Sequence, residues 1–166
     1  PYFILPPRIQ RVSMYPDPHS KPHARYLHQW SAPSSTRSTL RLPLALSAIE
    51  AGFPTPVESE LDGELDLNEL LIDHPNATFF VRVRGDSMRG AGIHHGDLLI
   101  VDRACTPQSG QVVVAVLHGE FTVKRWQVTE TGGLLTAENP HFSPIEIHPH
   151  HDFMIWGVVR YVIHRP

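Results

Sequence analysis

Two residues of this sequence could act together as a nucleophile and its base. Ser87 stands in the run Gly85-Asp86-Ser87-Met88, and Lys124 follows residues 121–123. A serine hydroxyl is a weak nucleophile that needs a base, and a buried, neutral lysine amine can be that base. A dipeptide of small residues, Ala51-Gly52, lies 35 residues before Ser87, and Lys124 lies 37 residues after it. We interpret this combination as a serine protease that cuts its own chain.

Lys124 can act as a base only where its surroundings exclude water. A free lysine has a pKa near ~10.4, so almost all of it is protonated at pH 7. Burial lowers that pKa because it disfavours the charged form. Six apolar residues near Lys124 could form the wall, and which of them face it is open: Val112, Val113, Val114, Val116, Phe121 and Val123. We expect the Ser87 backbone N–H to be an oxyanion-hole donor, since it stays beside the attacked carbonyl.

Each of these residues also has a structural interpretation when it is taken alone. A serine in a turn that contains glycine is usually structural, and a lysine beside an arginine, here Arg125, is usually a solvated surface residue. The protease interpretation depends on the conjunction of the two residues with a small dipeptide upstream.

Charge is distributed unevenly along the 166 residues. Residues 1–45 contain six Lys or Arg and one Asp, whereas the remainder contains eight basic and sixteen acidic residues. Phosphate contacts need clustered Lys and Arg, so we expect no direct DNA binding by the acidic remainder. The single cysteine, Cys105, allows no internal disulfide, which is typical of a reducing compartment. No apolar run approaches the ~20 residues that span a bilayer, so we expect a cytoplasmic protein.

Short apolar runs between glycine-containing turns predict a mostly β domain of short strands. His118-Gly119 reads as a hairpin turn, which places Lys124 on a strand near the core. Asp66 and Glu69 have the spacing of a capping box and predict a short helix. The β-rich segments are residues 79–84, 97–101, 111–117, 121–128, 145–148 and 153–163.

The beginning of the chain differs in composition from the rest. Residues 1–45 hold eight of the sixteen prolines and no sustained period, which predicts an extended or disordered arm. We expect residues 1–51 to be an arm that self-cleavage removes, and residues 52–166 to be the protease domain. Because the chain begins with Pro1 rather than Met, residues 1–42 are either native or the product of a mistaken start.

These motifs resemble the self-cleaving serine proteases of the LexA and UmuD family, and most closely its UmuD-like members. The resemblance spans roughly residues 43–163 and is carried by residues 52–54, 66–72, 74–75, 77–78, 85–88, 96–102 and 119–124. It implies a compact, mostly β protease domain with Ser87 as nucleophile and Lys124 as general base. It also implies that the bond between Ala51 and Gly52 is the one that is cut.

The same resemblance implies partners and a cellular role. A RecA filament on single-stranded DNA would stimulate the cleavage as part of the SOS response. The processed protein, as a homodimer, would then serve as a subunit of an error-prone translesion polymerase with a UmuC-like partner.

The sequence departs from the family pattern in two places, and two other functions remain alternatives. The arm is longer than in UmuD-like proteins, and Ala51, as in LexA, stands where they usually have cysteine. A LexA-like repressor fragment is disfavoured because a Pro-rich arm cannot form a helix-turn-helix. A binding module that regulates a polymerase without cutting is the second alternative.

Histidines occur in two clusters, His94-His95 and His148-Pro149-His150-His151-Asp152. Metal sites need further ligands at suitable spacing, and the sequence has no pair of thiols. We interpret these histidines as solvated loop residues and expect no metal. Since phosphate loops and dinucleotide fingerprints are absent from the sequence, we expect no cofactor either.

Overall fold

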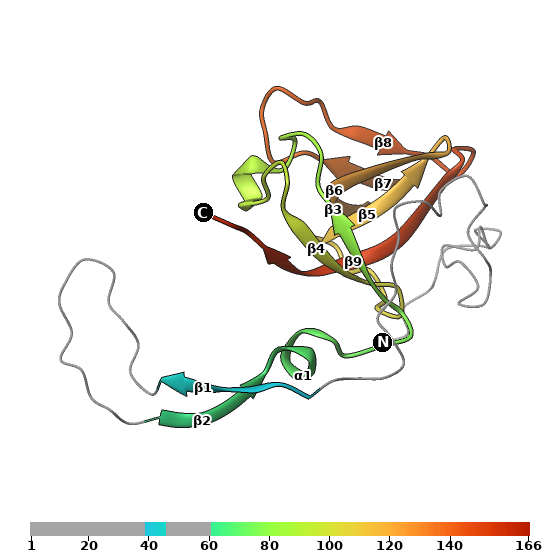
Figure 1. Cartoon of the computed structure of the whole chain (residues 1–166). Helices are drawn as coiled ribbons and strands as arrows, with labels where there is room; N and C mark the ends of the chain where they lie inside the picture. The colour runs from blue at the N-terminus through green and yellow to red at the C-terminus, as the bar shows by residue number, and fades with distance from the viewer. Residues whose placement is uncertain (1–38, 46–60) are drawn as a thin grey trace, which may run out of the picture.

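One seven-stranded antiparallel sheet dominates the computed structural model, which describes residues 39–45 and 61–166 (Figure 1). Its strand order is β3-β4-β9-β5-β6-β7-β8. The strands are β3 (Thr78–Arg82), β4 (Leu98–Asp102), β5 (Val112–Leu117), β6 (Glu120–Thr129), β7 (Gly132–Thr136), β8 (Ile145–Ile147) and β9 (Phe153–Ile163). A 3₁₀ helix, η2 (Arg89–Ala91), lies between β3 and β4.

The long strand β9 joins the two halves of this sheet. It pairs with β4 on one side and with β5 on the other, and the register shifts between Ile100 and Val101 and between Val114 and Ala115. Such irregularities bend a sheet and increase its twist. Two apolar clusters form the core, one around Trp156 and Met88 and the other around Trp126 and Leu135.

The turn between β5 and β6 sets the position of Lys124. His118 and Gly119 have φ angles of 50° and 81°, and Leu117 pairs with Glu120. Positive φ at both turn positions is the feature of a type I′ hairpin, whose twist matches that of the paired strands. The predicted hairpin is therefore present, and its register places Lys124 opposite Val113.

A second, two-stranded sheet pairs β1 (Arg41–Ala45) with β2 (Leu61–Asp66), and the short helix α1 (Leu67–Leu71) follows β2 directly (Figure 1). Asp66 caps the helix by accepting a hydrogen bond from the Asn68 N–H at 2.8 Å. The Tyr161 hydroxyl donates to the Leu70 carbonyl at 3.2 Å, which links α1 to β9.

The mostly β fold predicted from the sequence is confirmed. The six predicted strand segments all appear in the large sheet, and β7 is an additional strand that the sequence analysis did not predict. Strand β1 lies in the part of the chain assigned to the arm, and it is extended and paired with β2. The predicted cleavage bond, Ala51–Gly52, lies outside the described residues. Within the described part of the chain, no helix is long and apolar enough to cross a membrane.

Candidate active site

Ser87 lies in the loop between β3 and β4, and a buried neighbour anchors that loop. Met88 is 2 % exposed and belongs to the core cluster around Trp156. Gly85 has φ +96°, a conformation that residues with a side chain rarely adopt, so glycine allows the chain to turn after β3. The turn and the anchor together fix the direction in which the Ser87 side chain leaves the backbone.

Lys124 reaches this loop from β6. Its Nζ donates a hydrogen bond to Ser87 Oγ at 2.9 Å, although the two residues are 37 positions apart in sequence. The residue is only 7 % exposed. The structure therefore brings together the two residues that the sequence analysis selected, in contact and partly shielded from water.

Burial is also the main influence on the amine's protonation. It lowers the pKa of Lys124 below its ordinary value, because the protonated amine loses hydration. Phe142 adds to the enclosure, since its ring centroid lies 6.0 Å from Nζ. A lowered pKa makes the neutral amine, which a general base requires, more abundant near neutral pH.

The six apolar candidates for the wall fall on two faces of the sheet. Val113 is directly opposite Lys124, and cross-strand partners share a face. Val113 packs in the cluster with Trp126, so Lys124 leaves β6 on that side. The other five pack in the cluster around Trp156: Val112, Val114, Val116, Phe121 and Val123.

Two further acceptors hold the amine in place, and the sequence analysis did not select them. Lys124 Nζ donates to Thr122 Oγ1 at 3.1 Å and to the Val123 carbonyl at 3.0 Å. A neutral amine has two N–H groups and one lone pair. With both N–H groups directed to Thr122 and Val123, the lone pair is available to the Ser87 hydroxyl. Thr122 could have been found from the strand period, because residues two apart on a strand share a face.

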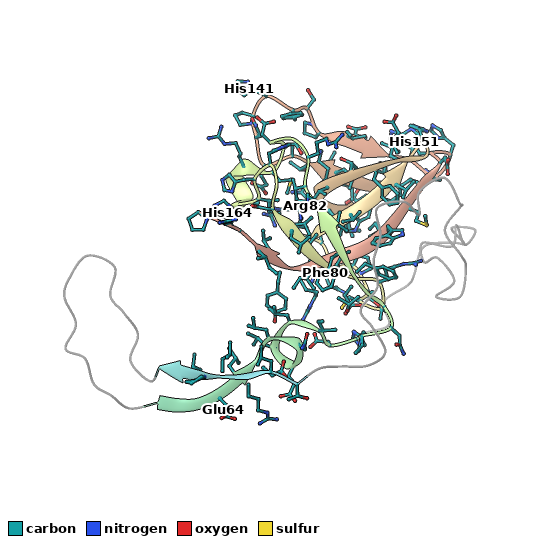
Figure 2. All side chains as sticks on the ribbon, viewed as in Figure 1. Glu64, Phe80, Arg82, His141, His151 and His164 are labelled. Atoms are coloured by element: carbon teal, nitrogen blue, oxygen red, sulfur yellow. The ribbon has the colours of Figure 1, made fainter. Side chains whose placement is uncertain are left out.

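An open cleft of about 660 Å³ lies beside Ser87. The residues that line it come from the end of β3, where Figure 2 labels Arg82, from the loop after β3, from the turn before β4, and from β5 and β6. They are Val81, Arg82, Val83, Arg84, Gly85, Ser87, Met88, His95, Gly96, Val114, Phe121, Thr122 and Val123. A cleft of this size with the Ser87 side chain on its wall can accept a segment of polypeptide.

The segment that follows β7 supports the loop of Ser87 from the other side. Asn139 Nδ2 donates to the Asp86 carbonyl at 3.0 Å, and the Gly90 N–H donates to the Glu138 carbonyl at 2.7 Å. These bonds bracket Ser87 in sequence. Within the described residues, no hydrogen-bond acceptor is found for the Ser87 N–H, so its role as an oxyanion-hole donor stays a prediction.

The chain matches the model of the family described as Peptidase S24-like over residues 43–160. That match covers well over half of the sequence. The chain is a UmuD-like member of the Peptidase S24 family. The family includes self-cleaving serine peptidases, and the resemblance predicted from the sequence is confirmed.

Several curated members of the S24 family are similar to this chain over most of their length. Protein ImpA of Salmonella typhimurium is 43 % identical over 144 residues, which are 83 % of this chain and 93 % of ImpA. Protein SamA of Salmonella typhimurium (strain LT2) is 45 % identical over 123 residues, 74 % of this chain and 85 % of SamA. A LexA repressor of Acidithiobacillus ferrooxidans is 44 % identical over 121 residues, but these are only 58 % of that protein.

Proposed function

We propose that this UmuD-like protein cuts its own chain between Ala51 and Gly52, with Ser87 as nucleophile and Lys124 as general base. The observation that carries the proposal is the 2.9 Å contact between Lys124 Nζ and Ser87 Oγ at a buried amine. Family membership supports the same chemistry. A serine that only forms a turn and a lysine that only solvates the surface would not need to be in contact with each other.

The proposed reaction has two steps. Neutral Lys124 takes the proton of the Ser87 hydroxyl while Oγ attacks the carbonyl carbon of Ala51, and the Ser87 N–H stabilises the resulting oxyanion. The Lys124 ammonium then protonates the leaving nitrogen of Gly52, and the peptide bond breaks to leave an ester between Ala51 and Ser87. Water, deprotonated by the same amine, hydrolyses the ester and restores the Ser87 hydroxyl.

The position of the bond along the chain suits an intramolecular substrate. Ala51 and Gly52 belong to the segment that connects β1 to β2, and β2 continues into the domain that carries Ser87. A tethered substrate has a high effective concentration at the cleft, so a site with weak affinity for free peptides can still cut its own chain. This arrangement favours a protein that is regulated by one cut in its own chain over an enzyme that digests other proteins.

The cellular part of the proposal rests on the resemblance to the LexA and UmuD group. We propose that a RecA filament on single-stranded DNA stimulates the cleavage by favouring a cleavage-competent arrangement that is otherwise rare. Residues 52–166 would then act as a homodimer with a UmuC-like polymerase in SOS mutagenesis.

Self-cleavage can be tested directly on the purified chain. Incubation at alkaline pH, or with RecA filaments at neutral pH, is expected to yield fragments that end at Ala51 and begin at Gly52, detected by intact mass. Ser87→Ala and Lys124→Arg should abolish both, because arginine keeps the charge but does not deprotonate. Ser143→Ala, at an exposed serine, is the matched control and should cleave like the parent.

The alternatives predict different outcomes. A binding module that never cuts would give no fragment under either condition. Cleavage that persists in folded Ser87→Ala would rule out the dyad, and cleavage at alkaline pH without any response to the filament would remove only the regulatory part of the proposal.

A further inference from the structure

Two histidines and a buried aspartate from separate parts of the chain meet close to the loop of Ser87. Asp97, which is 4 % exposed, lies between His94, from the turn before β4, and His164, which follows β9. Figure 2 labels His164 beside the C-terminal end of the chain. Asp97 Oδ1 lies 2.7 Å from His164 Nδ1, and Asp97 Oδ2 lies 3.7 Å from His94 Nδ1. One ligand atom from each residue can be chosen so that all three lie within 4.8 Å of one another.

One of these ligand atoms is buried and unsatisfied. His94 Nδ1 is shielded from solvent and has no hydrogen-bond partner among the described residues. Leaving a buried polar atom unpaired costs free energy, so such atoms are rare and call for an explanation. The His94 and His164 rings lie near each other, with centroids 5.1 Å apart. The unpaired nitrogen is thus close enough to the other two groups to share a ligand with them.

We propose that His94, Asp97 and His164 bind a transition-metal dication of the zinc class. Two imidazole nitrogens and one carboxylate oxygen suit Zn²⁺, Ni²⁺ or Cu²⁺, whereas Mg²⁺ and Ca²⁺ prefer sites made of oxygen ligands. Although the His94 Nδ1 atom is shielded, both histidine side chains are about half exposed, so the site borders solvent and water can complete the coordination of a metal.

Two distances, one from each oxygen of Asp97 to a histidine nitrogen, are near those that a metal needs. Ligand atoms around tetrahedral Zn²⁺, with bonds of ~2.0–2.1 Å, lie roughly 3.4 Å apart. The 3.7 Å between His94 Nδ1 and Asp97 Oδ2 is close to this value. The 2.7 Å hydrogen bond between His164 and Asp97 must open by about 0.7 Å. His164 lies on the surface beyond β9, where its side chain has room for that shift.

The carboxylate at the centre is held in position and charged. The His94 backbone N–H donates to Asp97 Oδ2 at 2.7 Å, and this hydrogen bond is the largest cause that keeps the pKa of Asp97 below its ordinary value. Arg82 brings a positive charge to the neighbouring residue, since its Nη1 donates a hydrogen bond to the Gly96 carbonyl at 3.0 Å. The Arg82 side chain is exposed, so solvent screens its repulsion of a metal ion.

A second cluster of possible ligands makes a useful contrast. His74 and Cys105 both approach the buried Asp102, at 2.7 and 3.3 Å from Oδ2, and the Ala104 N–H donates to Oδ1 at 2.7 Å. Both carboxylate oxygens are therefore satisfied by the protein, and neither the His74 nor the Cys105 ligand atom is a buried, unpaired group. The cluster at Asp102 therefore has no unpaired buried atom that a ligand would satisfy, whereas the cluster at Asp97 has one in His94 Nδ1.

The proposed metal site is connected to the loop that carries the nucleophile. The Gly96 N–H donates to the Val83 carbonyl at 3.0 Å, and the Gly85 N–H donates to His95 Nδ1 at 3.2 Å. The turn that supplies His94 is thus hydrogen-bonded to the chain just before Ser87. A bound metal would tie this turn to the end of β9.

The site can be tested by metal binding alone, without reference to cleavage. Zn²⁺ is titrated into the metal-free full chain carrying Ser87→Ala, so that the chain stays intact, in competition with a chromophoric chelator. His94→Gln and His164→Gln are each expected to weaken the tightest site by about tenfold or more, since each removes one ligand. His141→Gln, at an exposed histidine, is the matched control and should bind like the parent.

Two results would overturn the proposal. One is equal Zn²⁺ affinity in the parent, His94→Gln and His164→Gln, with all three folded by circular dichroism. The other is loss of the tightest site in His150→Gln but not in His164→Gln, which would assign the metal to the neighbouring rings of His148, His150 and His151. The absorption bands of bound Co²⁺ give a second readout, because they change when imidazole replaces water as a ligand. This change is expected in the parent but not in His94→Gln or His164→Gln.

Discussion

The Gly90 N–H donates to the Glu138 carbonyl at 2.7 Å, and this contact holds the loop of Ser87 against the segment that follows β7. The approach is close enough to exclude any side chain at position 90. A Cβ atom there would lie 2.6 Å from the same carbonyl oxygen, nearer than non-bonded carbon and oxygen atoms come. Glycine at this position, three residues after Ser87, therefore helps to hold the loop of the proposed nucleophile in place.

Gly90→Ala should impair cleavage more than folding. The loop must move away from Glu138, and Ser87 Oγ moves with it relative to Lys124 Nζ. A displacement of about 1 Å at a reacting group can cost roughly 100-fold in rate. Time courses of alkaline self-cleavage measure the effect, and thermal unfolding verifies that the variant is folded. A folded Gly90→Ala protein that cleaves at the parental rate would contradict the role given to this contact.

Thr122→Val should slow cleavage at every pH. Valine has the shape of threonine but removes the hydroxyl that accepts one N–H of the amine, so the lone pair of Lys124 is less firmly directed at Ser87. We expect the rate at its high-pH plateau to fall by about tenfold, which is only a part of the roughly 100- to 10,000-fold that general acid–base catalysis contributes, because the amine itself remains. The plateau is the informative quantity, because a shift in pKa alone would leave it unchanged. Thr122→Ser, which restores the acceptor, should recover most of the rate.

Lys124 also predicts how stability depends on pH. Its pKa in the folded protein lies below the value of ~10.4 for an unfolded chain. Between these two values the unfolded chain binds more protons than the folded one, so the free energy of unfolding rises with pH. Below the folded pKa, the cost of burying the ammonium is present in full. Lys124→Met removes the titration, and the stability of the variant relative to the parent should therefore decrease as pH rises through this window.

Urea unfolding between neutral pH and about pH 10 tests this prediction. Ser87→Ala serves as the parent so that neither protein is cut during the measurement. All other ionisable groups are the same in both proteins, so their contributions cancel in the difference. A stability difference that stays constant across the window would show that burial has not lowered the pKa of Lys124.

Much of the fold was predictable from local patterns, and the exceptions have identifiable causes. Runs of aliphatic residues and the His118-Gly119 turn predicted the strands that carry Lys124. Strand β7 was not predicted because it begins with Gly132 and Gly133, and glycine disfavours strands. Strand β1 was not predicted because Pro43 lies within it, and because the strand forms only by pairing with β2, which is not a local neighbour in sequence.

The residues of the candidate site could be predicted only where their type and spacing suggest a catalytic role. Ser87 and Lys124 were selected because their types and spacing are rare together. Asn139 and Phe142 reach the site through tertiary packing, which no local pattern reveals. His94 was interpreted as a solvated loop residue, because its neighbour His164 lies at the far end of the sequence.

Cleavage between Ala51 and Gly52 should release the fragment that carries β1. In the intact chain, β1 is tethered to β2 through the connecting segment, and cutting that segment makes their pairing bimolecular. The apolar side chains of β1 contribute little to holding it, since Leu42 and Leu44 are 53 % and 42 % exposed. Two-stranded sheets of this kind are marginally stable even when their strands are joined.

We therefore expect residues 1–51 to separate from residues 52–166 on size-exclusion chromatography of a cleaved sample at micromolar concentration. The backbone amides of β2 should then exchange with solvent faster than in the uncut Ser87→Ala chain, which is the control. Amides of β5 and β6 should keep their protection, because their pairing does not involve β1. Co-elution of the two fragments with β2 still protected would instead show that β1 remains in place after the cut.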